Sequence, residues 1–260
     1  MNFHYSSEEL YDAIKNTGVQ QGDLLLCHSN VGFWGRLKDA DTTNDTLNKI
    51  LTVVLGILGP QGTLVVPTFT YSFGKNELYD PEHSMSNCGL FAEFVRKHPF
   101  AIRSLDPSVS VAAIGHDKLS LTTNLPENAY SENSFFQRFY ERGGKILNFN
   151  LDAGTTLLHF AERELRVPYR FDKTFKGQIK VKDDIINAKS ILWVRKLSPG
   201  TEANFTIFHK EAVCANLYKM VKVGRGFVGS ISATSAFDLF NQLYKKDHYF
   251  LTNKGVKKYG

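Results

Sequence analysis

A histidine and a glutamate three residues apart are the clearest candidates for acid–base chemistry in this sequence. His159 and Glu162 lie in an apolar-patterned segment that predicts a helix over residues 153–166, which ends before Pro168. Side chains at this spacing project from one helix face, where a carboxylate can hold the imidazole tautomer and raise its basicity. The pair suits a general base. A histidine on an apolar face is more often a packed core residue, and that alternative stays open on the pattern alone.

A loop with two glycines is the clearest candidate for anion binding. Residues 24–27 form an apolar run that predicts a buried strand, and residues 28–35 (HSNVGFWG) follow it. Gly32 and Gly35 would let the backbone approach a ligand closely, and Thr42 could cap the next helix and leave its amides to a phosphate. The loop is neither a P-loop nor a dinucleotide-binding glycine motif. A surface loop with turn glycines is therefore the alternative.

Polar side chains also stand beyond the next predicted strand and in a later segment. Thr68 and Thr70 follow the apolar run at residues 63–66, and Arg103 and Asp106 lie in RSLDPSVS. The carboxyl ends of strands are where α/β folds place ligands. Arg103 could pair with an acid or a phosphate. Equally, Asp106 could belong to a turn, and the threonines could satisfy loop backbone.

Alternating helices and strands must position these candidates. Residues 20–70 predict a strand, a loop, a helix and a strand, which pack as a parallel pair. The later patterns predict helices at 89–97, 131–142, 206–219 and 234–246, and strands within 103–115, at 145–149 and near 177–195. No repeat, low-complexity stretch or linker interrupts the pattern. We therefore predict an α/β fold in a single domain, residues 1–260.

Composition limits the class of protein. Of 260 residues, 42% are hydrophobic, and 20 Phe with 11 Tyr exclude disorder as the main state. No apolar run is long enough to span a membrane. The net charge of +5 predicts attraction to anions, but no basic and aromatic pattern indicates nucleic acid. Three scattered cysteines and a polar N-terminus without signal-peptide features predict a cytoplasmic protein.

Several motifs, taken in order, resemble one family. They are HSNVGFWG, GTLVVPTFTYSF, GLFAEFVRKHPFAIRSLDPSVSVAAIG, SFFQRFYERGGKIL and TTLLHFAE. This order resembles the aminoglycoside 3-N-acetyltransferase family, which is not of the GNAT type. The resemblance covers about residues 5–165 and returns more weakly at GFVGSISATSAFDLF. It implies a three-layer α/β/α sandwich around a mixed, largely parallel sheet, and transfer of an acyl group from coenzyme A to an amine.

The resemblance also implies residue roles. His159 and Glu162 match the histidine and glutamate of the family's LHxAE motif, which makes His159 the expected catalytic base. The implied coenzyme A site comprises His28, Ser29, Asn30, Val31, Gly32, Phe33, Trp34, Gly35, Arg36, Thr68 and Ser110. The implied acceptor site comprises Thr70, Tyr71, Arg103, Asp106, Tyr169, Arg170 and Lys173. No metal is expected, although a metal enzyme or hydrolase using His28, His83 and His159 is an alternative.

Departures from the family pattern bear on the acceptor. Resistance enzymes of the family usually read RSxHPxxS, and this chain has Asp106 in place of that histidine. The segment after HFAE carries Arg170, Lys173 and Lys176, which suits an anionic acceptor better than a polycation. We therefore predict an acetyl or short hydroxyacyl transfer to an amino sugar, nucleotide-linked, and the resemblance to related sequences that read RSxDPxxS implies a role in surface polysaccharide synthesis. The alternatives are an aminoglycoside acceptor and an inactive coenzyme A-binding module, and a homodimer is one option for the assembly.

Overall fold

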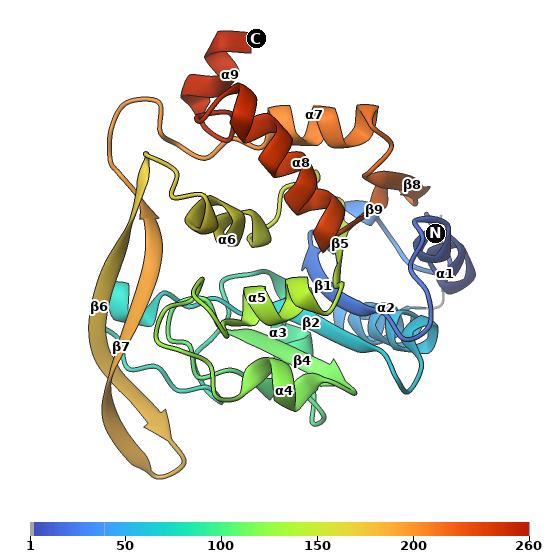
Figure 1. Ribbon diagram of the computed structural model, residues 1–260. Helices are drawn as coiled ribbons and strands as arrows, with labels where there is room; N and C mark the ends of the chain where they lie inside the picture. Colours follow the sequence, from blue (N-terminus) through green and yellow to red (C-terminus); the bar gives the residue numbers. More distant parts are fainter. Residues whose placement is uncertain (1–2, 39, 260) are drawn as a thin grey trace.

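Three parallel strands form the centre of a seven-stranded sheet (Figure 1). The computed structural model describes residues 3–38 and 40–259. The strand order is β3-β4-β2-β1-β5-β9-β8. β1 (Leu24–Ser29) pairs in parallel with β2 (Thr63–Pro67) and with β5 (Lys145–Phe149), so the strand–loop–helix–strand unit of residues 20–70 is confirmed.

The outer strands of this sheet pair in antiparallel fashion. They are β3 (Ile102–Arg103), β4 (Val111–Gly115), β8 (Lys219–Val223) and β9 (Gly226–Ser232). β4 runs against β2 and β3, and β9 runs against β5 and β8. Five of the seven strands therefore share one direction, which confirms the mixed, largely parallel sheet.

Helices cover both faces of the sheet and make the three expected layers. α1 (Ser7–Asn16), α2 (Thr43–Leu58) and α3 (Leu90–Arg96) pack on one face, with Leu25 and Cys27 of β1. α5 (Phe135–Glu141), α6 (Leu157–Glu164) and α8 (Ala233–Lys246) pack on the other face, with Leu24 and Leu26. Because successive side chains of β1 point to opposite faces of the sheet, they contribute alternately to the hydrophobic core on each face.

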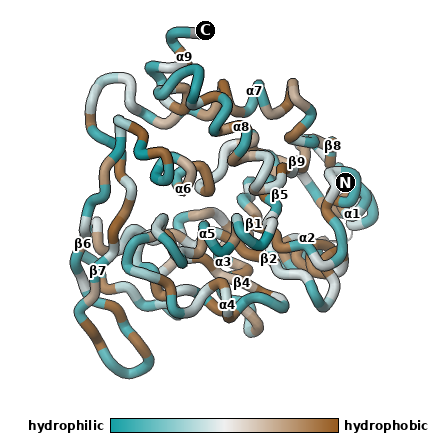
Figure 2. The backbone as a smooth tube through the Cα atoms, in the orientation of Figure 1, coloured by the Kyte–Doolittle hydropathy of each residue, from teal (hydrophilic) through white to brown (hydrophobic). Residues whose placement is uncertain are grey.

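Smaller elements complete the chain. They are α4 (Lys118–Thr122), α7 (Thr206–Cys214), α9 (Asn253–Tyr259) and the 3₁₀ helices η1 (Val31–Trp34) and η2 (Ser72–Lys75). No helix among the described residues is long and apolar enough to cross a membrane. Figure 2 shows hydrophobic residues along β2, β4 and α2 inside the molecule. It also shows them near the free end of the hairpin formed by β6 (Arg170–Val181) and β7 (Asp184–Arg195), where Ile185 and Ile186 are exposed.

Local sequence explains most of the element boundaries. α1 and α2 both begin at capping boxes, one between Ser6 and Glu9 and the other between Thr42 and Asp45. The strand expected within 103–115 is interrupted, because the Asp106 carboxylate accepts hydrogen bonds from the amides of Ser108 and Val109 and turns the chain. α6 begins at residue 157 instead of 153, since the preceding residues form a loop.

The strands expected near 177–195 form a long hairpin that already begins at Arg170. β6 (Arg170–Val181) and β7 (Asp184–Arg195) pair along their whole length and stand beside the sandwich (Figure 1). Isolated bridges join the hairpin to the body, between Tyr79 and Ile179 and between Asn128 and Ile191. A small apolar cluster of Phe73, Tyr79 and Ile179 fills the junction.

Gly177 allows this junction to close. A Cβ atom at Gly177 would stand 2.5 Å from the Phe73 ring, a contact that real Cβ atoms do not make. We expect Gly177→Ala to lower the free energy of unfolding by about 1–3 kcal/mol, measured by urea denaturation, because the hairpin must shift away from η2. Gly74→Ala is the matched control on the same junction, since its Cβ would meet Phe175 at an ordinary 3.8 Å. Equal stability of the two variants would contradict this account.

Candidate active site

The residues that the sequence singles out as a base and its partner are in contact. His159 Nδ1 lies 2.6 Å from Glu162 Oε2, on the inner face of α6. The Glu162 carboxylate also accepts a hydrogen bond from the Tyr169 hydroxyl at 2.7 Å and forms an ion pair with Arg170 Nε at 2.6 Å. The Glu162 side chain is 1% exposed, so three side chains share one buried carboxylate.

The electrostatics of this cluster favour a neutral histidine beside an ionised glutamate. Burial raises the pKa of Glu162, but His159, Arg170 and Tyr169 together outweigh it and leave this pKa below its ordinary value. Burial and the Arg170 charge lower the pKa of His159, against the opposing effect of Glu162. A neutral imidazole must donate Nδ1–H to the carboxylate, which leaves Nε2 as the free lone pair. This is the protonation state that a general base requires.

Two aromatic rings that the sequence patterns do not indicate flank the histidine. Tyr130 packs edge-on to His159 with ring centroids 6.1 Å apart, and Phe205 lies 6.4 Å away. The His159 side chain remains 21% exposed. Tyr130 comes from a loop, and Phe205 precedes α7, so neither has a local pattern that would link it to α6. The rings confine the imidazole while one side stays open to solvent.

Two of the predicted acceptor residues contact Glu162, and two others lie in the segment after β2. Tyr169 and Arg170 contact Glu162, and Tyr71 is 42% exposed at the end of the β2 segment, in a left-handed backbone conformation with φ of 55°. Burial raises the pKa of the Tyr71 phenol, and the Arg170 charge opposes this. Thr70 is buried, and its hydroxyl donates to the Pro107 carbonyl and accepts from Ser72.

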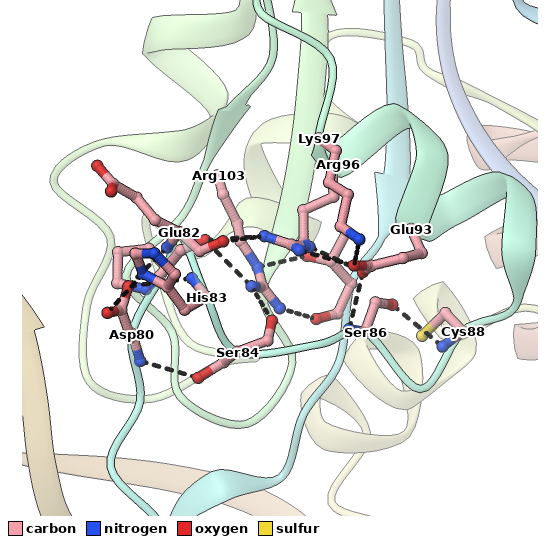
Figure 3. Close-up of polar contacts among 12 residues, drawn as sticks. Asp80, Glu82, His83, Ser84, Ser86, Cys88, Glu93, Arg96, Lys97 and Arg103 are labelled. Carbon is pink, nitrogen blue, oxygen red and sulfur yellow. Dashed lines mark hydrogen bonds and ion pairs between the residues drawn. The ribbon is translucent and has the colours of Figure 1, made fainter. Parts of the chain in front are cut away.

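Arg103 differs from the expectation that it pairs with an acid or a phosphate. Its guanidinium donates to the carbonyls of Thr68, Pro81 and Ser84, and Figure 3 shows it among the polar residues of the 80–88 loop. Its Nε also donates to the hydroxyls of Thr68 and Ser110, which bond to each other at 3.0 Å. These contacts make Arg103 a support for the loop after β2. A direct contact with acceptor stays a prediction, as it does for Thr68 and Ser110 with coenzyme A.

The basic segment after α6 is largely paired within the protein. Asp172 forms ion pairs with Arg163 at 3.2 Å and with Arg166 at 4.0 Å. Arg170 is paired with Glu162, and Lys173 lies 4.9 Å from the centroid of the Phe175 ring. Less positive charge therefore remains unpaired for an acceptor in the folded protein than the sequence of this segment predicts. Asp106, which the sequence places in the acceptor site, uses its carboxylate on backbone amides.

The predicted coenzyme A loop follows β1, with mixed exposure of its side chains. Trp34 is fully buried against Tyr5 and Phe149, whereas Phe33 is 65% exposed. Gly35 has φ of 87° and packs against His4, so its conformation is needed by the fold itself. His28 is enclosed beside β5, and Ser29, Asn30, Val31, Gly32 and Arg36 complete the segment. Binding of coenzyme A here stays a prediction.

The start of α2 offers less to a phosphate than the sequence predicts. Thr42 Oγ1 accepts from the amide of Asp45 at 3.1 Å, and Asp45 Oδ2 accepts from the amide of Thr42 at 3.0 Å. The helix end therefore already carries a carboxylate, which competes with an added anion. Across residues 3–38 and 40–259, no three His, Cys, Asp or Glu side chains come together in a way that could hold a metal.

The fold and the cluster define a class of protein, a three-layer α/β sandwich with a glutamate-supported histidine beyond the carboxyl end of a central parallel strand. The sequence profile described as aminoglycoside 3-N-acetyltransferase matches residues 28–245, and the chain belongs to this family. Aminoglycoside N(3)-acetyltransferase IV of Salmonella sp is 30% identical over 173 residues, which is 65% of this chain and 63% of that protein. Aminoglycoside N(3)-acetyltransferase III of Pseudomonas aeruginosa is 26% identical over 182 residues, which is 62% and 65%. Both matches span less than two thirds of the relative's length.

Solved structures share the fold. AAC-IIIb in a binary complex with CoASH has a TM-score of 0.80 at 21% identity, over 93% of this chain and 97% of that one. AAC-VIa bound to sisomicin has a TM-score of 0.79 at 20% identity, over 93% and 98%. The agreement in fold thus extends over nearly the whole chain.

The charges around His159 predict opposite pH shifts for two substitutions. Arg170→Met removes a cation that lowers the His159 pKa, so the acidic limb of kcat/KM should move to higher pH. Glu162→Gln removes an anion that raises this pKa, so the limb should move to lower pH, with a lower plateau. In the unaltered protein the limb should lie below pH 6.5. The measurement is the pH profile of thiol release, with Lys219→Met, at an exposed lysine of β8, as the control, and shifts in the same direction would refute the charge assignment.

Proposed function

We propose that the protein is an acyl-CoA-dependent N-acyltransferase that moves an acetyl group to an amine. The observation that carries this proposal is the His159–Glu162 contact, because it provides a neutral, oriented base in a member of this family. Residues 1–260 would act as one acyltransferase domain. A cytoplasmic location and a homodimer stay predictions.

The chemistry follows from the protonation states of the cluster. The acceptor ammonium gives a proton to His159 Nε2, while Glu162 holds the other ring nitrogen. The freed amine attacks the thioester carbonyl carbon, the carbon–nitrogen bond forms, and the carbon–sulfur bond then breaks. The leaving thiolate takes up the proton from the imidazolium, so coenzyme A leaves as a thiol, and the attacking nitrogen loses a second proton to solvent as the neutral amide forms. A well-placed base contributes about 10²–10⁴-fold, and holding the two reactants together contributes about 7–11 kcal/mol.

His159→Ala tests the base directly. Thiol release from acetyl-CoA with an amine acceptor should fall by about 10²–10⁴-fold, because no other group takes the proton at this position. The affinity for coenzyme A, measured by calorimetry, should change little. The control is His116→Gln, which alters an exposed histidine. Turnover that survives His159→Ala would contradict the assignment of His159 as the base. If the unaltered protein released no thiol, it would instead be an inactive coenzyme A-binding module.

The acceptor that the relatives support best is an aminoglycoside. The named relatives are aminoglycoside N(3)-acetyltransferases, and this favours the aminoglycoside alternative over a polysaccharide precursor. The structure also weakens the argument for an anionic acceptor, since Arg170 is neutralised by Glu162 and Arg166 lies near Asp172. We therefore propose an aminoglycoside-type amino sugar as the acceptor.

An anionic amino sugar is the second candidate, because lysines line the grooves beside the hairpin. A cavity of about 560 Å³ is lined by Lys176, Lys189 and Glu127 among others. An adjoining cavity of about 610 Å³ includes Lys189 and reaches Asp106. These lysines would suit the phosphates of a nucleotide-linked amino sugar.

An acceptor panel with a charge-reversal variant distinguishes the two candidates. Thiol release is measured with acetyl-CoA and either sisomicin or a nucleotide-linked amino sugar. We expect turnover of sisomicin, with little loss in the Lys176→Glu/Lys189→Glu variant. An anionic acceptor would instead be turned over preferentially, and its KM would rise about tenfold in that variant, as expected for two reversed surface charges. The second result would overturn the aminoglycoside proposal.

A further inference from the structure

A buried asparagine connects the central sheet to the helix that carries His159. Asn148 stands on β5 and is 0% exposed. Its Nδ2 donates to the carbonyls of Asp152 at 2.5 Å and Gly154 at 3.3 Å. These carbonyls belong to the loop between β5 and α6, so one side chain fixes the path of the chain shortly before the catalytic residue.

The same asparagine contacts a histidine on the neighbouring strand. His28 of β1 is the register partner of Asn148, and its Nδ1 lies 3.1 Å from Asn148 Oδ1. In a parallel pair, register partners project to the same face of the sheet. This face is the one covered by α6, because Leu26 and Ile146, two residues earlier on each strand, pack in the core with Phe160 and Ala161 of α6.

The hydrogen bonds determine the tautomer of His28. Two carbonyl acceptors require the amide nitrogen of Asn148 on their side, so the amide oxygen must face the imidazole. An oxygen acceptor requires a proton on Nδ1. Nε2 of His28 has no hydrogen-bond partner among the described residues and is closed to solvent. Burial lowers the pKa of His28 to about 4, so the ring stays neutral at physiological pH.

The far side of the loop is held independently. The amide of Ala153 donates to His209 Nδ1 at 3.2 Å, and the Tyr218 hydroxyl donates to the Leu151 carbonyl at 2.7 Å. The loop is therefore clamped between the sheet and the α7–β8 region. The Asn148 bonds on the sheet side and these contacts on the other side together set the path of the loop that leads to His159 in the first turn of α6.

We propose that Asn148 is a positioning residue that sets α6 against the sheet and locks His28 in the Nδ1–H tautomer. This inference rests on the proposed role of His159, but it assigns new roles to two residues whose hydrogen bonds, among the described residues, are to neither His159 nor Glu162. Asn148 acts through the loop carbonyls, and His28 acts by holding the Asn148 amide in one orientation. A misplacement of about 1 Å far from the chemistry can cost about 10²-fold in rate.

The tautomer is tested without any assay of activity. The protein is labelled with ¹⁵N-histidine, and the ring nitrogen shifts of His28 are assigned by their loss in His28→Gln. We expect a protonated Nδ1 and an unprotonated Nε2 near pH 7. An Nε2–H tautomer in the unaltered protein would overturn the proposal, whatever the variants do. In Asn148→Asp, the carboxylate should pair with His28, and both ring nitrogens should then carry protons.

Kinetics of Asn148→Leu test the positioning role. Leucine has a similar size but cannot hold the loop carbonyls, so kcat should fall by about 10²-fold with little change in KM for acetyl-CoA. Ser230→Ala is the matched control, since it removes another buried side-chain hydrogen bond, to the Thr17 carbonyl, from the adjacent strand β9. A folded Asn148→Leu protein with unchanged kcat would refute the role. A failure of the proposed role of His159 would be distinguishable from a failure of the Asn148 role, because activity would then survive His159→Ala.

Discussion

The buried carboxylate of Glu162 is the interaction on which the site depends. A charge that is 1% exposed is costly unless it is paired and hydrogen-bonded, and here a histidine, a tyrosine and an arginine share it. The partners come from different elements: His159 from α6, Tyr169 from the turn after it, and Arg170 from the start of β6. The cost of burying the charge is thereby offset by contacts that also join α6 to the hairpin. Removal of the carboxylate would leave Arg170 buried without its anion.

Sequence alone predicts the parts of this arrangement that depend on local spacing. The His159–Glu162 contact follows from a separation of three on a helix, and the β1–β2 pair follows from the strand–helix–strand pattern. Tyr130, Asn148 and the hairpin contacts are not predictable in this way, because they join segments that are far apart in the chain. Asn148 does leave one signal, a polar residue in the apolar run of β5, but its partners lie in β1 and in a loop.

The net charge of the sequence likewise does not predict the charge that an acceptor meets at the folded site. Residues 162–260 hold 19 of the 31 Lys and Arg but 9 of the 26 Asp and Glu, so this part carries a net charge of +10 and residues 1–161 carry −5. Folding then pairs the cations nearest the site, such as Arg170 with Glu162 and Arg163 with Asp172. Net charge describes a long-range field, whereas an acceptor meets the charges that remain unpaired beside the reacting atoms.

Two partly buried histidines on the same side of the sheet show how the partner decides the chemistry. Both His28 and His159 direct Nδ1 at a side-chain oxygen, and burial lowers the pKa of both rings. The partner of His159 is a carboxylate, whose charge opposes that lowering and stabilises the imidazolium that forms when a proton is taken up. The partner of His28 is an amide, which orients the ring but adds no anion. The first histidine is therefore suited to the proposed role of accepting a proton, while the second is suited to stay neutral and hold the structure around it.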